Sequence, residues 1–101
     1  MNILAVTACP AGVAHTYMAK KALEKEAKKM GYKIKVETQG SMGTENEINS
    51  KDLEKADLVI LAVDTKIEKA NRFDNKIVYE VPVADAVKNA SKVIKDATAK
   101  L

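Results

Sequence analysis

The chain is organised around one stretch, Ala8-Cys9-Pro10-Ala11-Gly12-Val13-Ala14-His15-Thr16, which holds its only cysteine and its only histidine. The stretch follows an apolar run, Ile3-Leu4-Ala5-Val6, that predicts a buried strand, and it leads into an amphipathic pattern that predicts a helix. A cysteine at such a turn faces the helix N-terminus, where unpaired N–H groups and the positive end of the helix dipole gather. That environment favours both a bound oxyanion and a thiolate. The stretch therefore predicts a sulfur nucleophile beside an anion-binding loop.

The residues after the cysteine suit a loop that holds phosphate. Pro10 has no N–H and stiffens the turn, so the hydrogen-bond donors would be the amides from Ala11 onward. Gly12 and the small side chains of Ala11 and Ala14 let the backbone approach an anion closely. We therefore predict that residues 10–16 bind phosphate.

His15 and Thr16 give the loop the spacing of the phosphatase motif Cys-x5-Arg-Ser/Thr, with histidine in the place of arginine. Histidine can donate to phosphoryl oxygens and change its charge with pH. It cannot reproduce the planar, permanently charged arginine clamp. This difference bears on which reaction to expect.

The composition predicts one cytoplasmic domain spanning residues 1–101. Its hydrophobic fraction of 47% and charged fraction of 31% are ordinary for a globular protein. The single cysteine excludes an internal disulfide and suits a reducing compartment. No apolar run approaches the roughly 20 residues that span a bilayer. The start of the chain also lacks the basic segment and cleavage site of a signal peptide.

The net charge of +3 and the aromatic content of 4% argue against a nucleic-acid partner. One dense basic group stands out. It consists of Lys20, Lys21, Lys25, Lys28 and Lys29. Because glutamates are interspersed, the simpler interpretation is a solvated helix face, and the alternative is a docking surface for an acidic partner protein.

The first half of the chain predicts two helices and a strand after the opening loop. Apolar residues at spacings of three and four predict a helix over residues 14–30, with Gly31 as its C-terminal cap. Residues 33–38 alternate polar and apolar, which is typical of a strand at a sheet edge. Ser50 is expected to cap a short helix over residues 51–56.

The second half predicts two further strands and two further helices. Residues 58–63 form a continuous apolar run, which indicates a central strand covered on both faces. A helical segment is expected over residues 65–72, with Ile67, Ala70 and Phe73 facing inward. Asn75 is expected in a turn that tolerates positive φ.

After that turn, residues 76–81 predict the other edge strand. Pro82 then opens one terminal helix whose apolar seam continues to Leu101. The β-α-β-α-β-α-β-α order with right-handed crossovers predicts an α/β fold. We expect a three-layer α/β/α sandwich, Rossmann-like, with a four-stranded parallel sheet in the order 2-1-3-4.

One polar turn and one aspartate lie where the sequence places the carboxyl ends of strands. Open α/β sheets bind ligands on that side. Gln39, Gly40 and Ser41 belong to a polar turn that either faces the cysteine loop or simply connects two elements. Asp64 ends the central strand. We favour it as the N-cap of the segment over residues 65–72, with a carboxylate near the cysteine as the alternative.

The stretch from Val6 to Ala19 resembles the signature of the fructose-type IIB component of the bacterial phosphoenolpyruvate-dependent sugar phosphotransferase system. The likeness continues through residues 35–43 and 56–64 and in Arg72-Phe73 ahead of Lys76. It covers nearly the whole chain. Asn75, where the family often has glycine, is a mild departure.

The resemblance implies that Cys9 accepts a phosphoryl group from a phosphohistidine on a IIA component. The phosphocysteine then passes it to a sugar, by default fructose, held by the membrane-embedded IIC component. Pro10 to Thr16 would form the phosphate loop, with Gln39, Gly40 and Ser41 beside it. No cofactor and no metal are predicted, and the protein would work at the inner face of the membrane.

Two other functions are compatible with parts of the pattern. A small cysteine phosphatase or an arsenate reductase shares the loop spacing, although the missing arginine and the absence of further cysteines count against both. A non-catalytic anion-binding module would have a merely structural Cys9, which is the usual state of a lone buried cysteine.

Overall fold

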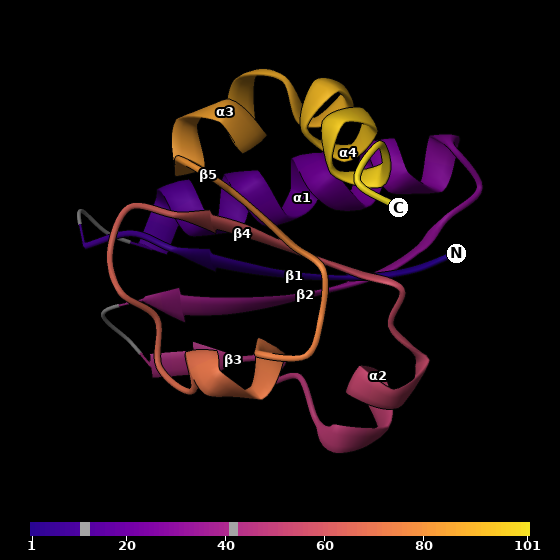
Figure 1. Cartoon of the computed structure of the whole chain (residues 1–101). Helices are drawn as coiled ribbons and strands as arrows, with labels where there is room; N and C mark the ends of the chain where they lie inside the picture. Colours follow the sequence, from indigo (N-terminus) through magenta and orange to yellow (C-terminus); the bar gives the residue numbers. More distant parts are fainter. Residues whose placement is uncertain (11–12, 41–42) are drawn as a thin grey trace.

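The computed structural model describes residues 1–10, 13–40 and 43–101, and in these residues a five-stranded sheet lies between helices on both faces (Figure 1). The strands are β1 (Asn2–Ala8), β2 (Lys33–Gly40), β3 (Gly43–Glu45), β4 (Leu58–Val63) and β5 (Val78–Val81). Their order across the sheet is β3-β2-β1-β4-β5.

The four parallel strands have the predicted order, because β1 pairs with both β2 and β4, and β4 pairs with β5. The predicted number of strands was wrong. β3 pairs antiparallel with the end of β2, from Thr38 opposite Glu45 to Gly40 opposite Gly43. β3 has three residues, all exposed, so it is too short to show the alternation that marks a strand. β2 is consequently not an edge strand along its last residues.

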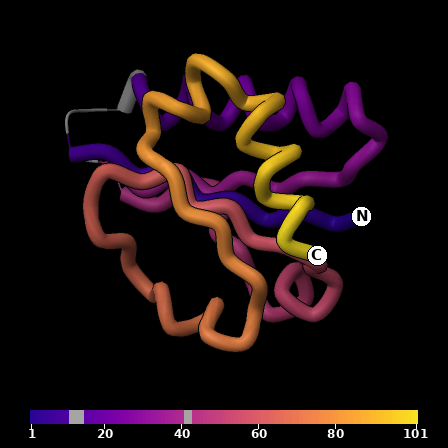
Figure 2. Tube along the Cα trace, turned by 45° about the horizontal axis from the view of Figure 1, so that its top comes forward, coloured from indigo at the N-terminus to yellow at the C-terminus, as the bar shows by residue number. Residues whose placement is uncertain are grey.

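The first face of the sheet, called here the α1 face, is covered by α1 (Val13–Lys29), α3 (Val83–Lys88) and α4 (Ala90–Thr98) (Figures 1 and 2). Leu23, Ile60 and Ile94 are fully buried between these helices and the sheet. α1 matches the predicted helix to within one residue at each end. Gly31 follows it with φ of 79°, as expected of a C-terminal cap.

The single terminal helix predicted after Pro82 was wrong, because it is divided into α3 and α4 at Asn89. Asn89 has φ of −150° and ψ of 57°, outside the helical region, and its side chain accepts a hydrogen bond from the Lys92 N–H at 3.4 Å. The apolar seam runs through both helices, so the periodicity alone did not reveal the break. At its end, Leu101 is exposed rather than buried.

The second face, called here the α2 face, carries α2 (Ser50–Lys55) and a 3-10 helix, η1 (Ala70–Phe73). A smaller apolar cluster lies under them. It consists of Leu4, Val6, Ile48, Val59, Leu61 and Phe73. The cap of α2 is Asn49 and not Ser50. The Asn49 side chain accepts from the Asp52 N–H at 2.9 Å, and the Asn49 N–H donates to the Asp52 carboxylate at 3.0 Å.

The helix predicted over residues 65–72 was also wrong, since only residues 70–73 are helical. Phe73 is buried as expected, but Ala70 is exposed. Among the described residues other than glycine, Asn46 and Lys69 have positive φ, and Asn75 does not. The last strand starts at Val78, two residues later than predicted.

The carboxyl ends of the parallel strands lie at one end of the molecule, and both chain ends lie at the other (Figures 1 and 2). Within the described part of the chain, no helix is long and apolar enough to cross a membrane.

Candidate functional site

Cys9 lies directly after β1 and before α1, at the turn where the sequence placed it. Only 5% of the residue is exposed, and it packs with the core of the α1 face. The carbonyl of Ala8 accepts a hydrogen bond from the Asp64 N–H at 2.9 Å, which ties the ends of β1 and β4 together. The Thr7 hydroxyl donates to the carbonyl of Thr16 at 3.1 Å, which ties β1 to α1. The cysteine is therefore held between two regular elements.

The predicted phosphate loop is Pro10, Ala11, Gly12, Val13, Ala14, His15 and Thr16. Residues 11–12 lie outside the described residues, and α1 begins at Val13. Pro10 and His15 are exposed, whereas Thr16 is buried against β1. α1 has no acidic residue in its first turn, so no carboxylate of that turn competes for the positive end of its dipole.

A cavity of about 420 Å³ lies beside Cys9, at the carboxyl ends of β1 and β2. Its described lining consists of Ala8, Cys9, Pro10, Gln39, Gly40, Gly43, Thr44, Thr65, Lys66 and Glu68. Gln39 and Gly40 thus line the same cavity as Cys9. They end β2 rather than form a free turn, and Ser41 lies outside the described residues.

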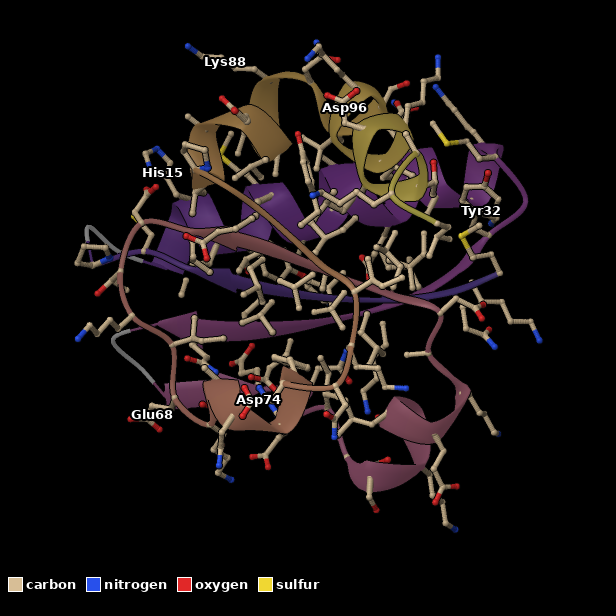
Figure 3. All side chains as sticks on the ribbon, viewed as in Figure 1. His15, Tyr32, Glu68, Asp74, Lys88 and Asp96 are labelled. Carbon is tan, nitrogen blue, oxygen red and sulfur yellow. The ribbon has the colours of Figure 1, made fainter. Side chains whose placement is uncertain are left out.

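His15 and Asp64 do not belong to the described lining of the Cys9 cavity. They lie together in a separate cavity of about 260 Å³, which also involves Met18 of α1 and Val87 of α3. Figure 3 shows His15 on the α1 face and Glu68 on the α2 face, at the same end of the molecule. The end of the sheet therefore separates two hollows.

Asp64 is not the N-cap of the segment that follows it; its carboxylate binds the start of α3, whose N-cap residue is Pro82. Its Oδ1 accepts a hydrogen bond from the Val83 N–H at 3.1 Å, at the start of α3. A carboxylate there satisfies an otherwise unpaired N–H of the first turn. Because β4 and β5 are neighbours, the residue after β4 reaches the helix that follows β5.

Glu37, to which the sequence analysis assigned no role, is buried in β2 and forms an ion pair with Arg72. The pair is bidentate, with distances of 2.6 Å from Nη2 to Oε2 and 2.9 Å from Nη1 to Oε1. The Glu37 carboxylate also accepts from the Ile48 N–H at 2.8 Å and from the Gln39 side chain at 2.7 Å. Arg72 Nη1 donates further to the carbonyl of Ile48 at 3.1 Å.

Burial by itself would raise the pKa of Glu37. The hydrogen bonds from Arg72, the Ile48 amide and Gln39, with the positive charge of Arg72, outweigh it and hold this pKa below its ordinary value of 4.5. Glu37 is consequently ionised at neutral pH. The buried pair remains charged on both sides.

The sequence did contain a signal for this pair. Arg72 is the only arginine in a chain whose other basic side chains, apart from one histidine, are lysines. Arginine presents a planar fork that matches a carboxylate bidentately, which lysine cannot do. The partner was hidden because Glu37 stands in an alternating strand, where a charged residue is expected to point to water.

The chain matches the family model described as "PTS system, Lactose/Cellobiose specific IIB subunit" over residues 4–96. It is 52% identical to the PTS system fructose-like EIIB component 2 of Escherichia coli K12, covering 99% of this chain and 94% of the relative. It is 46% identical to the PTS system fructose-specific EIIB'BC component of Rhodobacter capsulatus, covering 98% of this chain and 17% of that longer protein.

The fold is also similar to a solved structure, a domain of the fructose-specific IIABC component from Borrelia burgdorferi. The TM-score is 0.92 at 51% identity, covering 97% of this chain and 93% of that domain.

Proposed function

Since this chain belongs to the IIB components of the sugar phosphotransferase system, phosphocarrier domains of sugar uptake, we propose that Cys9 is the residue that carries the phosphoryl group. The observation that supports this most directly is the position of the thiol. Cys9 follows the central strand, precedes a long helix and borders a cavity of about 420 Å³. Phosphate fits such a helix N-terminus.

The proposed reaction has two displacements at phosphorus. The Cys9 thiolate attacks the phosphohistidine of a IIA component, so an S–P bond forms, the N–P bond breaks and the histidine nitrogen keeps the electron pair. A sugar hydroxyl held by the IIC component then attacks the phosphocysteine, so an O–P bond forms and the thiolate leaves. The hydroxyl proton passes to a base or water at the sugar site. We assign the phosphoryl oxygens to the backbone amides of residues 11–16. The side chains of His15, which lies in the neighbouring cavity, and of Thr16, which is buried against β1, are left out of this assignment.

Transfer rather than hydrolysis is supported by where the arginine lies. A phosphatase with this loop spacing uses an arginine clamp at the position of His15 to stabilise the charge that develops during hydrolysis. The only arginine of this chain is bound to Glu37 at 2.6 Å. A phosphocysteine without that clamp should survive in water until the acceptor arrives.

Fructose is the sugar that we propose, because the relatives at 46–52% identity are named as fructose-like or fructose-specific. The description of the family model names lactose and cellobiose, so the match to that model does not identify the sugar. The EIIB'BC relative joins IIB and IIC segments in one protein, which supports a membrane IIC component as the acceptor partner. We place the protein on the cytoplasmic side, docked to IIC during transfer.

The test is transfer of labelled phosphate from phosphoenolpyruvate through the general phosphotransferase proteins and a fructose-type IIA. Wild type should acquire a stable phosphate on Cys9, detected by intact mass, and Cys9→Ser should acquire none. Wild type alkylated at Cys9 serves as the matched control for the thiol. Hydrolysis of p-nitrophenyl phosphate without stable label would favour a phosphatase, and neither activity in the folded protein would contradict the proposal.

A further inference from the structure

Glu37 and Gln39 are two residues apart in β2, so their side chains leave the same face of the sheet. Both reach the stretch that runs from the end of β4 through η1, residues 64–73. Glu37 binds Arg72 in η1, and Gln39 binds the backbone of Glu68. The segment is therefore fastened to β2 at two points.

The Gln39 amide pairs with Glu68 in both directions. Its Oε1 accepts from the Glu68 N–H at 2.8 Å, and its Nε2 donates to the Glu68 carbonyl at 3.2 Å. A neighbouring β-strand would satisfy a backbone in the same way. The Gln39 side chain thus makes the two backbone hydrogen bonds with Glu68 that a neighbouring strand would otherwise make.

Glu37 dictates which way round the Gln39 amide lies. Gln39 Nε2 also donates to Glu37 Oε2 at 2.7 Å, and an ionised carboxylate can only accept hydrogen bonds. The NH2 group must therefore face Glu37, which leaves the amide oxygen for the Glu68 N–H. Arg72 in turn holds the carboxylate in place through two hydrogen bonds.

The fastened segment forms part of the wall of the Cys9 cavity, because Thr65, Lys66 and Glu68 line it together with the cysteine. Lys66 makes no hydrogen bond or ion pair with the described residues, and it lines both this cavity and the neighbouring one beside Asp64. Movement of the segment would change the distance between these side chains and a phosphoryl group on Cys9.

We propose that Gln39 is a positioning residue for phosphoryl transfer: oriented by the buried Glu37–Arg72 pair, it holds residues 65–68 as a wall of the Cys9 site. This inference rests on the proposed phosphocarrier function. It assigns a part in the reaction to residues that do not touch the sulfur.

The experiment compares Gln39→Met, Glu37→Gln and the control Glu24→Gln with wild type. Methionine keeps the length of Gln39 and removes its hydrogen bonds. The control makes the same chemical change as Glu37→Gln at a surface ion pair within α1, Lys20–Glu24, which spans 3.7 Å and does not involve residues 64–73. Two quantities are measured: hydrogen exchange of the Glu68 amide in the protein alone, and the KM and kcat of phosphoryl transfer from IIA.

In Gln39→Met we expect exchange of the Glu68 amide to rise at least tenfold, with the slowest amides of the β1 core unchanged. We expect kcat to fall by about tenfold to a hundredfold, the range for misplaced groups around a reacting centre, with a smaller change in KM. Glu37→Gln should change both quantities in the same direction, and Glu24→Gln neither. A purely structural role would lower the folded fraction and leave kcat per folded molecule unchanged.

Wild-type kcat in Gln39→Met would overturn the inference, and so would wild-type protection of its Glu68 amide. Because Gln39 is only half-buried, we expect Gln39→Met to fold. This variant therefore tests the inference even if Glu37→Gln does not fold. If wild type itself accepts no phosphate, the proposed function fails and the inference with it. The exchange data, which need no donor, would then still show whether Gln39 holds the segment.

Discussion

The two faces of the sheet are held by different kinds of interaction. On the α1 face, α1, α3 and α4 pack through apolar side chains such as Leu23 and Ile94. On the α2 face, a small apolar cluster lies beside the ion pair of Glu37 and Arg72, whose side chains are 1% and 12% exposed. Apolar packing has no direction, whereas a bidentate ion pair fixes distance and orientation together.

The two walls of the Cys9 cavity are held by these two different kinds of interaction. Cys9 belongs to the core of the α1 face, where close packing keeps the strand and the helix in place. The other wall comes from a segment with little regular structure, which the α2 face holds through directed hydrogen bonds. A site at the end of this sheet therefore depends on both kinds of interaction.

The largest effect on stability is expected from Arg72→Met, which breaks the pair on the α2 face. The substitution leaves the Glu37 carboxylate buried without its partner, and such a loss costs about 3–5 kcal/mol. Urea unfolding at neutral pH measures it. A cost under about 1 kcal/mol, typical of an exposed ion pair, would contradict the view that this pair holds the face.

The pH dependence of that cost follows from the direction of the pKa shift. In wild type the pKa of Glu37 is lowered, so the pair's contribution is complete above 4.5 and is lost as pH falls through the lower folded value. In Arg72→Met the hydrogen bonds and the positive charge of Arg72 are lost, so the pKa of Glu37 is higher than in wild type. The variant therefore takes up its proton at a higher pH than wild type and recovers stability as it does so. The gap between the two proteins should narrow as pH falls. A gap that stays constant would mean that Glu37 charge is not the cause.

Leu23→Ala provides the matched test on the α1 face. Leu23 is fully buried, and truncating a buried leucine costs about 3 kcal/mol through lost burial and the cavity left behind. Because no titratable group is involved, the cost should be the same at neutral pH and near pH 4.5. Urea unfolding at both pH values checks this. A cost that varies with pH as in Arg72→Met would remove the distinction between the faces.

Most of the α1 face could be predicted from the sequence. α1 follows from a period of 3.6 residues, the two central strands from continuous apolar runs and the two strands beside them from alternation. The order of these strands follows from the handedness of crossovers. The position of Cys9 follows from a strand that runs into a helix. The break at Asn89 escaped notice because the apolar seam continues across it, although an asparagine inside a helical pattern is itself a cap former.

The α2 face could not be predicted in the same way. β3 and η1 have three and four residues, too few for a period to appear. The Glu37–Arg72 pair joins residues 35 positions apart, and a single sequence does not show which charges meet. The cap of α2 was displaced by one residue because Asn49 and Ser50 are both good caps, and only the reciprocal bond with Asp52 separates them.

The smallest effects on stability are expected at the two asparagine caps, Asn49 on the α2 face and Asn89 on the α1 face. Asn49→Ala should cost about 1 kcal/mol, because α2 contains no buried residue and depends on its capping box. Asn89→Ala should cost about half as much, since its bond to the Lys92 N–H is long, at 3.4 Å, and α4 is also held by Val93, Ile94 and Ala97. Thermal unfolding ranks the two variants. If Asn89→Ala were the costlier, caps and not apolar packing would hold the helices of the α1 face, and the two faces would differ less than their contacts indicate.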